Sequence, residues 1–220
     1  MTPKNLRQKT NLLIGFLVLF YTGGLLLFMV EPLRSLFVIL TPFSLILSCG
    51  AVLAFQKEWS GKLIIAFVIV LFSALVIEII GVRTGVLFGE YVYGRTLGIK
   101  ISETPILIGL NWLLLIYCTA SIVNYHFKNR NIRIILGSVL MVVYDLILEY
   151  IAPVTDMWSW EARYPGIRNF LMWFLVALVF HALFQILDLK IENKPAGYLF
   201  LIQFLFFCGI GLYSVLTVQV

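Results

Sequence analysis

The sequence predicts an all-α, polytopic membrane protein, a bundle of about seven transmembrane helices. The first observation is the composition: hydrophobic residues make up 61% of the 220 positions and charged residues 12%, and the mean hydropathy is +1.01. Soluble domains carry about 25% charged residues, so this composition indicates a membrane protein. The second observation is that the apolar residues are gathered into long uninterrupted runs.

Seven of these runs are long enough to cross a bilayer core, which takes about 17–25 helical residues. Each is apolar around its whole circumference, as expected for a helix surrounded by lipid. The runs are Leu12–Val30, Leu36–Phe55, Leu63–Val82, Ile106–Val123, Ile132–Ala152, Phe170–Leu187 and Tyr198–Val220. The strand-like alternation that a membrane β-barrel requires is absent. We expect one integral-membrane domain over residues 1–220, with the core of the active site in 63–187.

The positive charge of the chain predicts its orientation. The net charge is +5, and ten of the sixteen Lys and Arg residues lie in cytoplasmic segments if the N-terminus is cytoplasmic, as the positive-inside rule favours. We therefore expect a protein of the bacterial cytoplasmic (inner) membrane with a cytoplasmic N-terminus. We attribute the charge to this topology and not to nucleic-acid binding.

Three acidic residues interrupt the apolar runs. Asp145 and Glu149 lie within "YDLILEYIAP" with a spacing of four, so they share one helix face, and Glu78 lies near the end of the third run. At 1.5 Å per residue, Glu78 is about 6 Å, Asp145 about 10 Å and Glu149 about 5 Å from the end of its span. A carboxylate at the centre of a span costs about 2.5–3.5 kcal/mol, which indicates a function for the three.

Polar and aromatic residues converge on the same half of the bilayer as the acids. The third and fifth spans end on the side where the fourth and sixth begin. Asn111 and Trp112 lie near the start of the fourth span, Asn169 and Trp173 lie near the start of the sixth, and the two loops on this side are rich in Tyr, Trp and Glu. We therefore predict a cavity between the third, fourth, fifth and sixth spans, lined by buried acids and aromatic rings.

Buried acids and aromatic rings suit proton-initiated chemistry on a hydrophobic alkene. A carboxyl group in apolar surroundings tends to keep its proton and so can act as an acid. Aromatic faces stabilise a carbocation by about 0.5–2 kcal/mol each. We expect no cofactor and no metal site. The alternative explanation is that the acids only bond neighbouring helices.

The residues around the acids resemble a known family. The segments "EIIGVRTGVLFGEYVYG" from Glu78, "PILIGLNW" from Pro105, "YDLILEYIAP" from Tyr144 and "WSWEARYPGIRNFLMWF" from Trp158 are similar to integral-membrane carotenoid biosynthesis proteins of the carotenoid 1′,2′-hydratase type, which include the γ-carotene and bisanhydrobacterioruberin hydratases. The resemblance covers roughly Leu63 to Leu187.

The resemblance implies addition of water across the terminal 1′,2′ double bond of an acyclic carotenoid end group. The substrate would be γ-carotene- or lycopene-like and would arrive from the lipid; the oligomeric state is left open. We assign Asp145, the deeper acid of its pair, as the proton donor, Glu149 as the group that holds water or restores the donor, and Glu78 as an electrostatic partner of the cation. The expected substrate-binding residues are Phe88, Tyr91, Asn111, Trp112, Trp160, Asn169 and Trp173.

Three other functions share some of these features. A small membrane-type carotenoid (lycopene) cyclase also begins with protonation, but an internal alkene captures the cation instead of water. A membrane prenyltransferase would use Asp145, Glu149 and Asp156 to bind Mg²⁺. A proton-coupled transporter would use the intramembrane acids as a relay.

Overall fold

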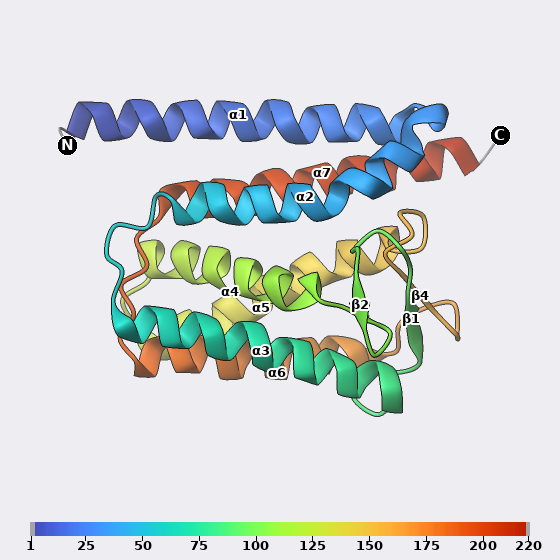
Figure 1. The fold of residues 1–220 in the computed structure, drawn as a ribbon. Helices are drawn as coiled ribbons and strands as arrows, with labels where there is room; N and C mark the ends of the chain where they lie inside the picture. Colours follow the sequence, from blue (N-terminus) through green and yellow to red (C-terminus); the bar gives the residue numbers. More distant parts are fainter. Residues whose placement is uncertain (1–2, 219–220) are drawn as a thin grey trace.

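Seven long helices form the protein (Figure 1). The structure, a computed structural model, describes residues 3–218. The helices are α1 (Pro3–Met29), α2 (Arg34–Leu53), α3 (Gly61–Thr84), α4 (Leu107–His126), α5 (Arg130–Ile151), α6 (Ile167–Ile186) and α7 (Lys194–Val218), and a short 3₁₀ helix, η1 (Glu31–Leu33), joins α1 to α2. All seven are long and apolar enough to cross a membrane. The prediction of an all-α bundle is confirmed, and the helices agree with the predicted spans to within a few residues except at the start of α1, which begins at Pro3 instead of Leu12. The predicted end of the last span, Gln219 and Val220, lies outside the described residues.

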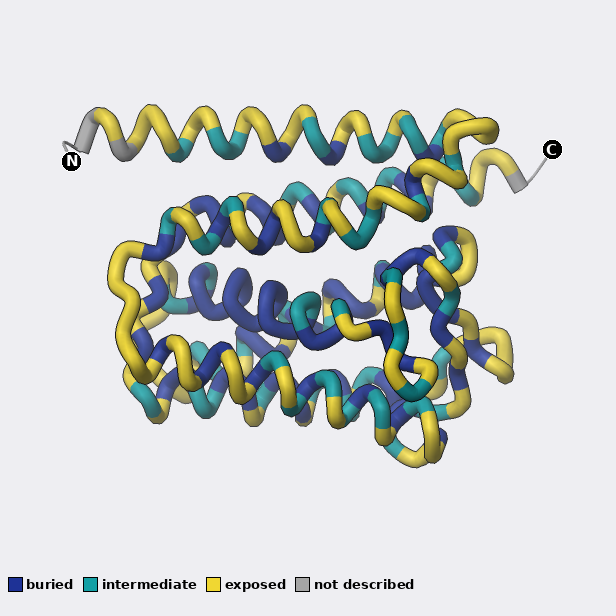
Figure 2. Tube along the Cα trace, in the orientation of Figure 1, coloured by how far each residue is buried: buried dark blue, intermediate teal, exposed yellow. Residues whose placement is uncertain are grey.

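Helix α4 is the centre of the bundle. In its most apolar window 72% of the residues are buried, against 17% in α1 (Figure 2). It packs against α3, α5 and α7, while α5 packs along α6 and α1 along α7. Together α1, α2 and α7 cover one side of the layer formed by α4 and α5, and α3 and α6 cover the other (Figure 1).

Local capping interactions fix the ends of the helices that carry the acids. The Ser60 hydroxyl accepts a hydrogen bond from the Leu63 N–H at the start of α3, and the Asn129 side chain accepts two backbone N–H groups at the start of α5. These side chains satisfy N–H groups that have no partner within the helix. Helix α3 ends at Gly85, whose φ of 62° is accessible to glycine at little cost.

Two small antiparallel sheets lie in the loops that leave α3 and α5. Strand β1 (Tyr91–Tyr93) pairs with β4 (Trp158–Trp160), with Tyr91 opposite Trp160 and Tyr93 opposite Trp158. Strand β2 (Lys100–Ile101) pairs with β3 (Thr104–Pro105). We call the β1–β4 pair the aromatic ribbon. The ribbon's patterns, "YVY" and "WSW", are each only three residues long, which is too short to stand out as strand-like alternation in the sequence.

A close helix contact holds α4 against α3. Gly109 of α4 faces the backbone carbonyl of Leu71 in α3, and a Cβ atom at position 109 would collide with that oxygen. The position requires glycine because the neighbouring atom is backbone and cannot turn aside.

We predict that Gly109→Ala lowers the free energy of unfolding by about 1–3 kcal/mol, the usual cost of overpacking. The matched control is Gly50→Ala in α2, where an added Cβ meets no atom within 4 Å. The control should unfold at or above the wild-type midpoint, since alanine favours a helix over glycine. Thermal unfolding in detergent measures both, and equal midpoints for Gly109→Ala and wild type would contradict the prediction.

Candidate active site

Glu78 is the centre of the first group of polar contacts. Its side chain is buried in α3. Its Oε2 accepts hydrogen bonds from the Tyr91 hydroxyl at 2.6 Å and the Tyr93 hydroxyl at 2.9 Å, and its Oε1 accepts one from the Trp112 Nε1–H at 2.8 Å. All of these donors are aromatic side chains, two from β1 and one from α4.

Glu149 is the centre of the second group. Its Oε2 accepts the indole N–H groups of Trp158 at 3.0 Å and Trp160 at 2.5 Å. The Asn169 Nδ2 of α6 donates to the Glu149 Oε1 and to the Asp145 Oδ2, at 3.0 Å each. Asn169 therefore links the two acids that α5 places on one face.

The aromatic ribbon joins the two groups. Because side chains alternate along a strand, Tyr91 and Tyr93 of β1 and Trp158 and Trp160 of β4 all turn inward and are buried, while Val92 and Ser159 between them are exposed. The Tyr91 and Trp160 ring centroids lie 5.0 Å apart, and those of Tyr93 and Trp158 lie 6.0 Å apart. The ribbon is thus a lid of four rings, with β1 bonded to Glu78 and β4 bonded to Glu149.

The space between α4 and α6 on the inner side of the acids is filled by rings. Trp112 and Trp173 stack with centroids 4.2 Å apart, and Phe180 packs edge-on against Trp112 at 6.2 Å. Phe88 packs edge-on against Tyr91 at 6.3 Å. Flat π-faces therefore surround the acids on several sides.

The three acids differ in the number of hydrogen bonds that their side chains accept. Burial and the nearby Glu78 carboxylate raise the pKa values of Tyr91 and Tyr93 above the ordinary tyrosine value, so both phenols keep their protons and donate to Glu78 at neutral pH. Glu149 accepts three N–H groups. Asp145 accepts one hydrogen bond, and among the described residues its fully buried Oδ1 has no partner. Such a site can hold two carboxylates and one carboxyl group that has an oxygen free to carry a proton.

Most of the predicted site residues lie together. Glu78, Tyr91 and Trp112 form the first group, and Asp145, Glu149, Asn169 and Trp160 form the second; Phe88 and Trp173 pack against these groups. Asn111 lies apart from these groups: it makes no hydrogen bond to the acids and lines the cavity described next. Sequence reasoning omitted Tyr93 and Trp158, although each occupies the second inward position of an aromatic–x–aromatic pattern.

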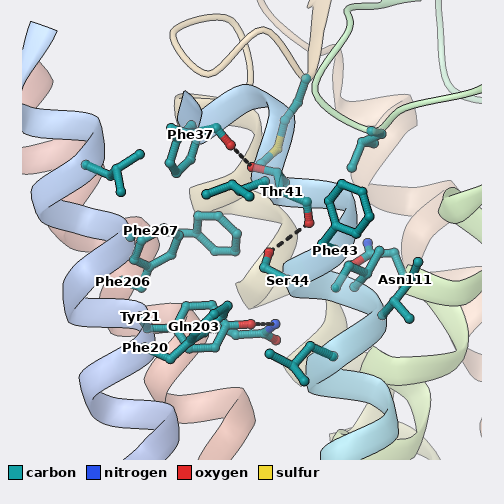
Figure 3. A pocket seen from close by; sticks show the side chains of 18 of the residues that line it. Phe20, Tyr21, Phe37, Thr41, Phe43, Ser44, Asn111, Gln203, Phe206 and Phe207 are labelled. Carbon is teal, nitrogen blue, oxygen red and sulfur yellow. Dashed lines mark hydrogen bonds between the residues drawn. The ribbon is translucent and has the colours of Figure 1, made fainter. Parts of the chain in front are cut away.

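A large cavity lies apart from the predicted position between the third, fourth, fifth and sixth spans. It has a volume of about 720 Å³ and is bounded by α1, α2, α4, α5 and α7, with neither α3 nor α6 in its wall (Figure 3). Near the acids, Trp112 of α4 stacks on Trp173 of α6. A second hollow, of about 490 Å³, lies outside the ribbon and is lined by Arg83, Glu90, Tyr91, Trp160 and Glu161 among others.

Asp156, the third acid that a prenyltransferase would use to bind Mg²⁺, makes its contacts away from Asp145 and Glu149. Asp156 Oδ2 accepts a hydrogen bond from Arg95 Nε at 2.8 Å and is partly exposed. Within residues 3–218 no group of three or more His, Cys, Asp and Glu side chains is arranged to hold a metal ion.

The seven apolar helices define the protein as an integral membrane protein. A family model described as carotenoid biosynthesis protein matches residues 38–218. The chain belongs to this family, which places it in carotenoid biosynthesis with a carotenoid-type substrate. The match extends on both sides of the 63–187 region and includes most of α2 and all of α7 up to Val218. No curated protein and no solved structure matches the chain significantly.

We predict that Trp112→Phe destabilises the protein more than Trp173→Phe. Both changes shrink one ring of the same stack, but only the first removes a hydrogen-bond donor from Glu78. A hydrogen bond to a charged group contributes about 1.5–3 kcal/mol, so the free energies of unfolding of the two variants should differ by about that amount. Denaturant unfolding in detergent provides the comparison, and equal losses would show that Trp112 acts by packing alone.

Proposed function

We propose that this protein is a carotenoid hydratase, a hydro-lyase that needs no cofactor and adds water across the terminal C1′,C2′ double bond of an acyclic carotenoid. The observation that carries the proposal is a carboxyl group with an unpaired oxygen, Asp145, placed among two fully bonded acids and several aromatic rings. The carotenoid-type substrate follows from the family. The hydration and its mechanism are our proposal.

Asp145 is the proposed proton donor. An unpaired ionised oxygen in a buried site is far more costly than a neutral one, so the free Oδ1 favours the protonated form. The proton on Oδ1 has no acceptor among the described residues, which leaves it available to an incoming alkene. The proton bonds to C2′ of the end group through the π electron pair, and positive charge develops at C1′.

Glu149 and Glu78 are the proposed carboxylates. The three N–H groups that point at Glu149 can only donate, and this favours its ionised form. A water oxygen then bonds to C1′ and gives its extra proton to Glu149. Glu149 shares the Asn169 amide with Asp145, so it is the nearest group to restore the donor's proton. The balance is one water added and a tertiary alcohol formed.

Aromatic rings around the acids support a cationic intermediate. Each ring face stabilises a nearby cation by about 0.5–2 kcal/mol when water is excluded. Tyr91, Trp112, Trp160 and Trp173 are all buried within the site. These rings disfavour the reaction of the cation with bulk water, and they do not themselves react with it as nucleophiles.

The polar hollow outside the ribbon favours hydration over cyclisation. Tyr91 and Trp160 line this hollow and also bond Glu78 and Glu149, so water there is separated from the acids by single side chains. At the same place, a hydrogen bond from the protonated Glu161 carboxyl to Glu90, together with the charge of Glu90, raises the pKa of Glu161. A cyclase, by contrast, has to keep water from the cation.

We predict that Asp145→Asn abolishes product in a host that accumulates lycopene, with the protein still present in the membrane. Asparagine keeps the shape and can accept the Asn169 hydrogen bond, but it has no transferable proton; loss of a general acid costs about 10²–10⁴-fold in rate. Pigment mass analysis gives the readout: hydration adds the mass of one water per end group, whereas a cyclised product is isomeric with its substrate.

The matched control is Asp156→Asn, an acid near the same membrane face that pairs with Arg95 outside the site. Its φ of 54° suits asparagine, and conversion should be unchanged. Glu149→Gln should be severely impaired, partly because an amide N–H₂ would oppose the donors around it. Activity in all three of Asp145→Asn, Glu149→Gln and Glu78→Gln would show that the acids are structural, and isomeric products in the wild type would favour the cyclase.

We further propose that the protein lies in the bacterial cytoplasmic membrane with its N-terminus in the cytoplasm. We expect reporters fused after α2 or α6 to be active only in the cytoplasm, and reporters in the α3–α4 loop to be active only outside. The positive-inside bias is the physical basis. The reverse pattern would overturn the orientation and leave the site unaffected.

A further inference from the structure

The large cavity opens sideways from the bundle. Leu19 of α1 and Phe43 of α2 line it and are 75% and 65% exposed, so its mouth faces the lipid between these two helices. Its volume of about 720 Å³ lies in the range of small-molecule sites, roughly 300–1,000 Å³. Helix α2 contains Pro42 between the lining residues Thr41 and Phe43; a proline inside a helix removes a backbone hydrogen bond and bends it.

The inner wall of the cavity lies against the proposed catalytic acids. Trp158 lines the cavity and donates its indole N–H to Glu149. Tyr144 and Leu148, which precede Asp145 and Glu149 in α5, also line it. One layer of side chains therefore separates the cavity from the acids.

We propose that this cavity binds the conjugated hydrocarbon chain of the carotenoid and that the end group reaches the acids beside Trp158. The orientation of the bound carotenoid, with its end group toward the acids, rests on the proposed function. The carotenoid enters the cavity from the lipid, whereas water approaches the acids from the hollow on the other side of the ribbon. Trp158 is thus the positioning residue between chain and acid.

The lining favours a rigid polyene over a flexible acyl chain. Rings from three helices, Tyr21, Phe37, Phe206 and Phe207, face the cavity (Figure 3) and can pack against a flat conjugated chain. Asn111 adds a polar group on the α4 wall: within the described chain its side chain has no hydrogen-bond partner. A few such polar groups in an apolar site commonly fix the orientation of a ligand.

The test fills the cavity from two opposite walls. In Gly23→Phe of α1 the new Cβ meets no atom within 4 Å, and in Ser44→Phe of α2 the ring enters from the other side. The matched control is Gly15→Phe, which is also in α1, also has no atom within 4 Å of the new Cβ, and does not line the cavity. The probe is lycopene, added to each purified variant in nanodiscs, with bound pigment per protein measured by absorbance and Trp fluorescence quenching.

We expect Gly23→Phe and Ser44→Phe each to weaken lycopene binding by roughly tenfold or more, which corresponds to about 1.4 kcal/mol per factor of ten, while Gly15→Phe binds like the wild type. Asp145→Asn should bind lycopene normally and not convert it. If Asp145→Asn converts lycopene while the filled variants fail to bind it, the hydratase mechanism is wrong and the cavity assignment holds. Wild-type binding by both filled variants, an equal loss in Gly15→Phe, or a wild-type protein that retains phospholipid but takes up no lycopene would overturn the cavity assignment.

Discussion

The need to satisfy buried carboxyl groups within a membrane governs the architecture of this protein. A polar group in hydrocarbon has no water to bond, and Glu78, Asp145 and Glu149 all lie in helices that cross the apolar core. Their donors come from the loops and from neighbouring helices. The aromatic ribbon, the Asn169 link and the Trp112 contact together account for every hydrogen bond given to the three acids. The small sheet is therefore explained by the chemistry of the helices beneath it.

The ribbon also divides two environments. Trp158 and Trp160 donate to the same oxygen of Glu149, yet Trp158 lines the apolar cavity and Trp160 lines the polar hollow. Both rings face the same side of β4, so the alternation of side chains does not explain why they line different spaces. The two rings line different spaces because they lie at different positions along the strand. In the proposed hydration this arrangement lets an oily substrate and water approach the same acid without sharing a path.

The sequence predicted the helices well because apolar length is a direct signal of a membrane span. It also predicted which acids and tryptophans would cluster, since counting spans places Glu78, Asp145 and Trp112 on one side of the bilayer. It could not predict the pairing of β1 with β4, because that contact joins residues far apart in the chain and each strand is only three residues long. Counting spans also could not separate Asn111 from the acids: adjacent residues on a helix point about 100° apart, so Asn111 lines the cavity while Trp112 bonds Glu78.

The position of the cavity was beyond the reach of sequence reasoning. The residues of α1 and α2 that line the cavity are mostly apolar, so nothing in their composition marks them as walls of a binding site. The site between α3 and α6 was predicted as hollow because its residues are chemically distinctive. Two of the rings that make it distinctive, Trp112 and Trp173, stack on each other there.

The order of the hydrogen-bond partners along the chain has a consequence for biosynthesis. Within the described part of the chain, the donors to Glu78 (Tyr91, Tyr93 and Trp112) and the donors to Asp145 and Glu149 (Trp158, Trp160 and Asn169) all follow their acids in the sequence. A chain made from its N-terminus therefore delivers each acidic helix to the translocation machinery before the groups that will bond it have been synthesised. Helix insertion alone leaves the acids unpartnered, and the site is completed only when β4 and α6 emerge and dock onto segments already in the membrane.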